Sequence, residues 1–178
     1  MEQVIIPDWL RAIDILVGAL SIALCSFVLI GLVPSSVAIL ILLIITLFMV
    51  GLARFARAAA VKAKGTSRRA MNLGAGIFGI GAASLLIFDI QLPEETILIL
   101  LAIAWMIMGL ARISIGLIER DVPLWARILQ IVVRLTTVAL TGVVVMFPVA
   151  DFSTILLFLL ITIIANGFAR TSGGYVGV

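Results

Sequence analysis

Polar and charged residues divide this sequence into six long apolar runs. A helix needs about 20 such residues to cross the hydrocarbon core of a bilayer. The runs do not alternate apolar and polar residues as the strands of a membrane β-barrel do, and a helix satisfies its own backbone hydrogen bonds in lipid. The pattern predicts an all-α polytopic membrane protein with transmembrane helices over 13–32, 37–56, 71–90, 96–115, 128–147 and 154–168. The last of these is the shortest, and an extension to 170 is the alternative for its end.

A repeat of 58 residues runs through these helices. The motif Gly-x-Ala-Arg ends every second apolar run, at 51–54, 109–112 and 167–170. Upstream of it, seven of the sixteen positions from 39 to 54 hold the same residue in all three copies. Pro34, Pro93 and Pro148 stand near the middle of each copy, where a proline fits a tight turn. We therefore predict one membrane domain of three tandem helical hairpins (1–58, 59–116 and 117–174) around a pseudo-threefold axis.

Basic residues mark one end of these predicted hairpins. All twelve Lys and Arg stand at or near the termini and the boundaries between the copies, whereas the turns inside the hairpins are neutral or acidic. The positive-inside rule then predicts a multi-pass protein of the cytoplasmic membrane with both termini in the cytoplasm. The net charge of +3 is interpreted as this topology signal and as contact with anionic lipid headgroups, not as nucleic-acid binding.

The first helix of each hairpin carries a polar stripe at helical spacing. In each copy it begins with arginine and continues with a carboxylate or an amide. It ends in small or polar residues, with the exception of one arginine in the third copy. The three stripes are Arg11, Asp14, Gly18, Ser21 and Cys25; Arg69, Asn72, Gly76, Gly79 and Ala83; and Arg127, Gln130, Arg134, Thr137 and Thr141.

Small and polar residues of membrane helices face protein and not lipid. We therefore expect the stripe to face other helices, with Gly79 in close contact with one of them, and the Ile- and Leu-rich second helices to meet lipid. Two interpretations of the stripe remain open. Close helix packing is favoured because small residues are common at helix contacts; the alternative is a polar vestibule rimmed by the three stripe arginines, Arg11, Arg69 and Arg127.

Arg134 is the large exception in the stripe. It lies two turns, about 10 Å, deeper than the arginine that opens its helix. A lone arginine at the membrane centre costs about 2.5–3.5 kcal/mol on insertion scales. Two hypotheses follow: Arg134 extends toward the cytoplasm, or it pairs with Asp14 on the equivalent face of the first copy.

Three glycine and arginine pairs close the repeats: Gly51 and Arg54, Gly109 and Arg112, and Gly167 and Arg170. A cationic side chain complements the dipole at the end of a helix, and the small residue one turn earlier leaves room for a neighbouring helix. We predict that each arginine reaches the carbonyl groups of a neighbouring helix or a lipid phosphate, and so holds one repeat against the next.

Several kinds of chemistry are missing from the sequence. With no histidine and one cysteine, it cannot form a histidine-based catalytic triad, a zinc or iron–sulfur site, or an intrachain disulfide. It has no ATP-binding loop, and the glycine-rich stretch at 74–79 lies inside an apolar helix without a preceding strand. We therefore expect neither an enzyme nor a cofactor.

The three hairpins ending in Gly-x-Ala-Arg, two of them opened by Trp9 and Trp125, resemble the HdeD family of small six-helix prokaryotic membrane proteins. The resemblance implies this fold, a plasma-membrane location and a role in acid-stress tolerance, with no catalytic residue to carry over. We expect a non-enzymatic membrane protein that acts in stress tolerance or membrane organisation. Two alternatives remain: an accessory subunit of a larger membrane complex, and a channel or transport module for protons or small anions. The expected partners are membrane lipids, with a homo-oligomer or other membrane subunits left open.

Overall fold

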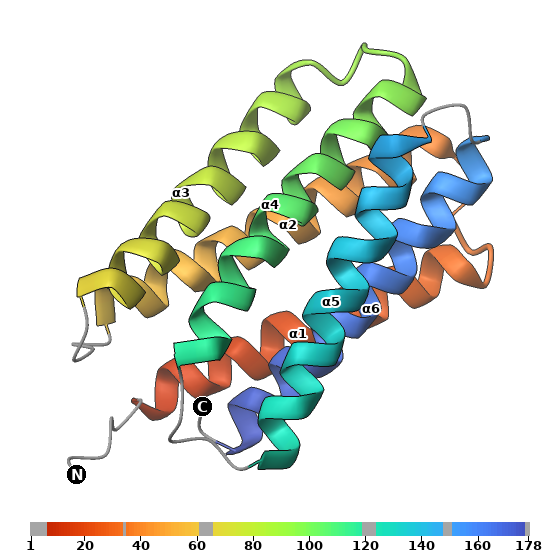
Figure 1. The fold of residues 1–178 in the computed structure, drawn as a ribbon. Coiled ribbons are helices and arrows are strands. Elements are labelled where there is room, and N and C mark those ends of the chain that lie inside the picture. Colours follow the sequence, from red (N-terminus) through yellow and green to blue (C-terminus); the bar gives the residue numbers. More distant parts are fainter. Residues whose placement is uncertain (1–6, 34, 61–65, 119–123, 148–150, 177–178) are drawn as a thin grey trace, which may run out of the picture.

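The computed structural model describes residues 7–33, 35–60, 66–118, 124–147 and 151–176, without the side chains of 66–68, 112, 114–118, 126, 127 and 176. This part of the chain folds into six helices (Figure 1): α1 (Asp8–Leu29), α2 (Ser36–Ala60), α3 (Thr66–Phe88), α4 (Glu94–Ile118), α5 (Leu124–Met146) and α6 (Phe152–Val176). All six are long and apolar enough to cross a membrane. The protein is thus an all-α, multi-pass integral membrane protein, as the apolar pattern predicted.

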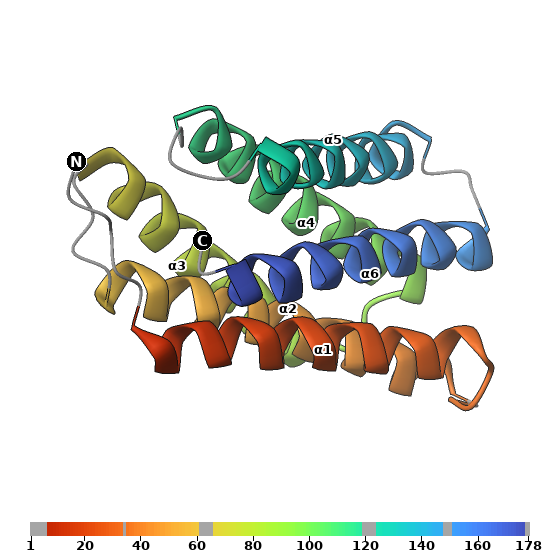
Figure 2. The ribbon, with the colours of Figure 1, turned by 90° about the horizontal axis from the view of Figure 1, so that it is seen from below.

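The six helices run along a common direction, and both termini lie at the same end of the bundle (Figure 1). We call this the terminal end and the opposite one the turn end. The closest neighbours are α1 with α6, α2 with α3, and α4 with α5 (Figures 1 and 2). Each of these pairs joins helices from two different predicted hairpins, so the tightest packing connects the copies instead of lying within them.

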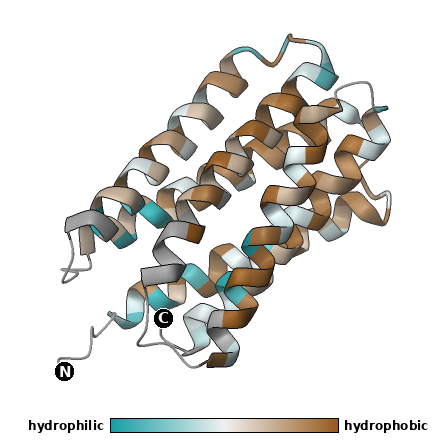
Figure 3. Ribbon diagram, in the orientation of Figure 1, coloured by the Kyte–Doolittle hydropathy of each residue, from teal (hydrophilic) through white to brown (hydrophobic). Residues whose placement is uncertain are grey.

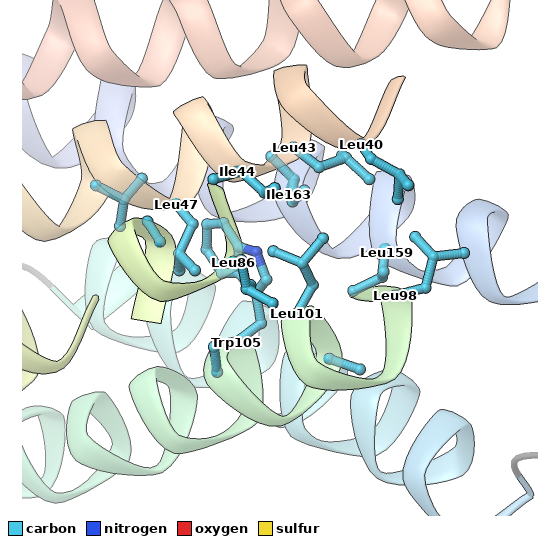
Figure 4. Close-up of a cluster of buried hydrophobic side chains, with 14 of the residues drawn as sticks. Leu40, Leu43, Ile44, Leu47, Leu86, Leu98, Leu101, Trp105, Leu159 and Ile163 are labelled. Atoms are coloured by element: carbon cyan, nitrogen blue, oxygen red, sulfur yellow. The ribbon is translucent and has the colours of Figure 1, made fainter. Parts of the chain in front are cut away.

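Apolar side chains of α2, α4 and α6 meet in the centre of the bundle (Figure 4). The expectation that these helices meet lipid was incomplete, because each keeps an exposed apolar side but also supplies the core. A lipid tail and a packed protein core accept the same side chains, so hydropathy does not distinguish the two environments. The central cluster includes Leu40, Leu43 and Leu47 of α2, Leu98, Leu101 and Trp105 of α4, and Leu159 and Ile163 of α6.

Polar residues gather in two places on this apolar bundle, at the turns and among the helices toward the terminal end (Figure 3). The second group explains the length of α6, which extends to Val176, past both of its predicted ends at 168 and 170. The added segment contains Arg170 and Thr171, which end the apolar run in the sequence. Both nevertheless bind within the bundle, Arg170 to Asp14 on α1 and Thr171 to the carbonyl of Gly167.

A glycine ends α1 at the turn end. Gly31 has a φ of 71°, in the left-handed region that glycine adopts without strain. This conformation lets the N–H of Leu32 donate to the carbonyl of Phe27 at 3.1 Å, which closes the last turn of the helix. Of the predicted turn prolines, Pro93 directly precedes α4, while Pro34 and Pro148 lie outside the described residues.

Asp151 caps the start of α6. Its carboxylate accepts hydrogen bonds from the backbone N–H of Thr154 at 3.3 Å and from the Thr154 hydroxyl at 2.6 Å. The hydroxyl bond is the main reason that the pKa of Asp151 lies below its ordinary value. The cap therefore stabilises the fold above the ordinary aspartate pKa of about 3.9 and ceases to do so as the pH falls through the lowered pKa of the folded state.

We expect Asp151→Ala to melt below the wild-type protein near pH 6 and at nearly the same temperature near pH 3. The measurement is thermal unfolding of both proteins in detergent at the two pH values. Asp89→Ala is the control, since Asp89 is also exposed at the turn end. A gap between Asp151→Ala and wild type that stays constant with pH would contradict this account of the cap.

Candidate functional site: a buried arginine cluster

Glycines bring the helix backbones into contact at two of the three closest helix pairs. A Cβ on Gly18 of α1 would lie 2.7 Å from the carbonyl oxygen of Gly167 on α6. A Cβ on Gly76 of α3 would lie 2.8 Å from the backbone nitrogen of Phe55 on α2, and its other neighbours include the Gly51 carbonyl oxygen at 3.1 Å. Neither position has room for a side chain.

Gly79 confirms the expectation of close packing for the stripe of α3. A Cβ there would lie 3.2 Å from the Cα of Gly51 on α2 and 3.1 Å from the sulfur of Met108 on α4. The stripe positions of α1 and α5 face inward as well, because Asp14, Ser21 and Cys25 of α1 and Thr141 of α5 are buried.

The third close pair, α4 with α5, is built differently. A Cβ on Gly109 of α4 would meet the Thr137 side chain of α5 at 3.2 Å. The position that corresponds to Gly18 and Gly76 in the 58-residue repeat is Arg134, which is buried. At this pair an arginine therefore lies inside the bundle where the other two pairs have a glycine. Its Nη2 donates to the side-chain oxygen of Gln130 at 2.6 Å.

Two of the arginines that close the predicted repeats make matching contacts. Arg54 on α2 donates from Nη2 to the carbonyl oxygen of Met108 on α4 at 3.1 Å. Arg170 on α6 donates from Nη2 to the carbonyl oxygen of Val50 on α2 at 3.3 Å. Met108 and Val50 are themselves 58 residues apart. Each arginine thus binds the residue just before the repeat glycine of another copy. The side chain of Arg112 lies outside the described residues.

The arginines at the start of the stripe bind the ends of neighbouring helices. Arg11 donates to the carbonyl oxygens of Gly174 and Tyr175 at 3.2 and 3.0 Å, at the end of α6. Arg69 donates to the carbonyl oxygen of Ala58 at 3.1 Å, at the end of α2. Such contacts satisfy carbonyls that have no partner within their own helix. The side chain of Arg127 lies outside the described residues.

Asp14 is the buried carboxylate among the described residues. It accepts from Nη2 of Arg57 at 2.6 Å and from Nη1 of Arg170 at 3.0 Å, and so connects α1, α2 and α6. Its ion pairs are with these two arginines, so the hypothesis of an Asp14–Arg134 pair is wrong. The helix arrangement explains this result, because α1 packs against α6 and α2, whereas α5 packs against α4 and α6.

Sequence reasoning missed Arg57, which was counted only among the basic residues of the loop. Its side chain is 23% exposed and reaches from α2 to Asp14. The available signal was its spacing, because residues three apart share a helix face and Arg54 was already a candidate.

Of the other stripe residues, Asn72 and Gln130 are half-buried on α3 and α5. Asn166 on α6 donates to the Thr137 hydroxyl on α5 at 2.7 Å.

The charged side chains of the bundle interior form one group, which we call the arginine cluster: Arg54, Arg57, Arg134, Arg170 and Asp14. Arg54 interacts electrostatically with all four others. Among the described residues, this cluster contains four guanidinium groups and one carboxylate. The chemistry suited to this arrangement is the binding of an anion, because guanidinium groups donate charge-assisted hydrogen bonds to several oxygens at once.

The remaining candidates do not form a second site. Trp105 is buried in the apolar core, whereas Trp9 and Trp125 are 52% and 57% exposed near the terminal end. In the part of the chain that the structure describes, no three His, Cys, Asp or Glu side chains come together as a metal site would require.

Neither the protein-family models, nor the curated proteins, nor the solved structures include a match to this chain.

Proposed function

We propose that this protein is a non-enzymatic membrane protein of the HdeD type with a role in acid-stress tolerance. The observation that carries the proposal is the position of Asp14, a buried carboxylate that joins α1 to Arg57 of α2 and Arg170 of α6. Arg54 and Arg170 make matching contacts with residues that are themselves 58 apart. These contacts support the predicted pseudo-threefold arrangement of hairpins, which is the fold that the resemblance to the HdeD family implies.

This link depends on the charge of Asp14. The charged groups around Asp14 are Arg57 and Arg170, which it contacts, and Arg54, with which it interacts electrostatically. Without the negative charge of Asp14, Arg57 and Arg170 would lose the counter-charge that they share, and the contact between the first and last helices would weaken.

The test measures the survival of the source organism in acid, with the gene present and with the gene deleted. We expect the deletion to lower survival at low pH and the wild-type gene to restore it. Asp14→Asn should restore less survival than the wild-type gene at equal amounts of protein in the membrane, because its side chain carries no charge to hold Arg57 and Arg170. Asp8→Asn is the matched control, since that carboxylate is 99% exposed. A deletion without effect on acid survival would argue against the role.

We further propose that the terminal end faces the cytoplasm, because the basic residues concentrate there. The experiment starts from Cys25→Ser, which removes the single native cysteine. A membrane-impermeant thiol reagent added outside intact cells should then label Gln91→Cys at the turn end and leave Asp8→Cys at the terminal end unlabelled. The reverse labelling pattern would require the opposite orientation.

A further inference from the structure

Arg54 has hydrogen-bond donors that the fold does not use. The residue is 4% exposed, and its Nη2 donates to Met108. Its Nε and Nη1 are buried and have no hydrogen-bond partner in the described part of the chain. Leaving a buried charged donor without an acceptor costs more than leaving a neutral one. Buried groups of this kind therefore indicate a missing acceptor.

The charges around Arg54 indicate that the missing acceptor is negatively charged. Its electrostatic neighbours are three arginines and Asp14, and Asp14 already accepts from Arg57 and Arg170. The other described carboxylates lie elsewhere. Asp8 is exposed at the start of α1, and the rest stand at the turn end, namely Asp89, Glu94, Glu95 and Asp151. A negatively charged ligand would supply the acceptor that the two unused Arg54 donors lack.

The donors also select the kind of anion. Guanidinium groups recognise oxyanions through several directed hydrogen bonds, whereas a halide offers a single point of charge. Two separate donors on Arg54, together with neighbouring guanidinium groups from α2, α5 and α6, match a tetrahedral anion with several oxygens. Phosphate has this form, both as a free ion and within a lipid headgroup.

The depth of the cluster fits a ligand that enters from the terminal end. Arg54 and Arg170 each lie six residues before the end of their helix, about 9 Å along the axis. The side chain of Arg57 is 23% exposed, so the cluster reaches the surface of the bundle through this residue. An anion from solution or a headgroup phosphate at the interface can approach by this side.

We propose that the arginine cluster is a binding site for a phosphate-class oxyanion, with Arg54 as its central ligand. The ligand is either free inorganic phosphate or the phosphate of an anionic membrane lipid. The site does not depend on the role in acid tolerance, because it requires only that the anion binds.

The test uses the purified full chain in a neutral detergent, freed of bound lipid. In the first arm, inorganic phosphate is titrated against chloride at constant ionic strength and its Kd is measured by calorimetry. In the second arm, native mass spectrometry measures retention of phosphatidylglycerol against uncharged diacylglycerol. Each arm compares wild type, Arg54→Gln and Arg69→Gln, the last being a control because Arg69 caps α2 outside the cluster.

We expect wild type and Arg69→Gln to bind alike, and Arg54→Gln to bind at least about tenfold more weakly, the factor that about 1.4 kcal/mol produces. A response to phosphate identifies the free ion as the ligand, and a response to phosphatidylglycerol alone identifies the headgroup. Either outcome supports the site. Wild type that binds neither probe would overturn it, as would equal binding by wild type and Arg54→Gln.

Arg54→Lys keeps the test decisive if Arg54→Gln does not fold. Lysine retains the charge but loses the planar arrangement of donors. Binding that is weaker than wild type in this variant supports the site, and unchanged binding contradicts it.

Discussion

Replacing Gly76 by alanine is expected to lower the free energy of unfolding by about 1–3 kcal/mol, the usual cost of overpacking. The added Cβ would lie 2.8 Å from the backbone nitrogen and 3.0 Å from the Cα of Phe55 on α2. Backbone atoms cannot move aside as a flexible side chain can, so α2 and α3 must separate. Gly76→Leu should separate them further and prevent recovery of a folded monomer.

Gly74 provides the matched control for this prediction. It lies on α3 two residues away, and a Cβ there would meet no atom within 4 Å. Alanine favours a helix over glycine by roughly 0.5–1 kcal/mol, so Gly74→Ala should leave stability unchanged or raise it. Thermal unfolding of both variants in the same detergent measures the difference. Equal stability of the two variants would show that the backbones of α2 and α3 are not in contact.

Replacing Asp14 by asparagine is expected to destabilise the protein by about 3–5 kcal/mol, the usual effect of removing one partner of a buried ion pair. The substitution preserves the shape of the side chain but leaves Arg57 and Arg170 without their shared counter-charge. Arg170 is the more affected partner because its side chain is 4% exposed, whereas that of Arg57 can reach water. Asp8→Asn, at the exposed start of α1, should change stability little.

A double variant distinguishes loss of this ion pair from a general disturbance of α1. Combining Asp14→Asn with Arg170→Gln removes both charges, so the double variant should be more stable than the sum of the two single losses predicts. Unfolding of all four proteins of the cycle in detergent gives the coupling energy. Strictly additive losses would mean that Asp14 and Arg170 act independently.

The six helices were predictable because each depends on a local property. A run of about 20 apolar residues meets the length requirement of the bilayer wherever it stands in the chain. The inward direction of the polar stripe was also predictable, since Asp14, Gly79 and Thr141 follow helical spacing and lipid does not accept such a row. The 58-residue repeat identified Arg54 and Arg170 as candidates before any neighbour was known.

The end of α6 was not predictable from hydropathy. Arg170 and Thr171 interrupt the apolar run in the sequence, yet the helix continues because both are satisfied inside the bundle. Arg170 donates to Asp14 on α1 and to the carbonyl of Val50 on α2, and the Thr171 hydroxyl donates to a carbonyl of α6 itself. Asp14 lies 156 residues away from Arg170, so no window along the chain contains both members of the pair.

The pattern of residues along the chain was thus enough to predict the number of helices, their apolar composition and the inward face of α1, α3 and α5. The packing of the helices was needed to learn that α2, α4 and α6 supply the core and that Asp14 binds Arg57 and Arg170 instead of Arg134. One cause underlies both of these results. Lipid and protein interior are equally apolar, and the partner of a buried charge depends on which helices become neighbours, which is a property of the whole bundle.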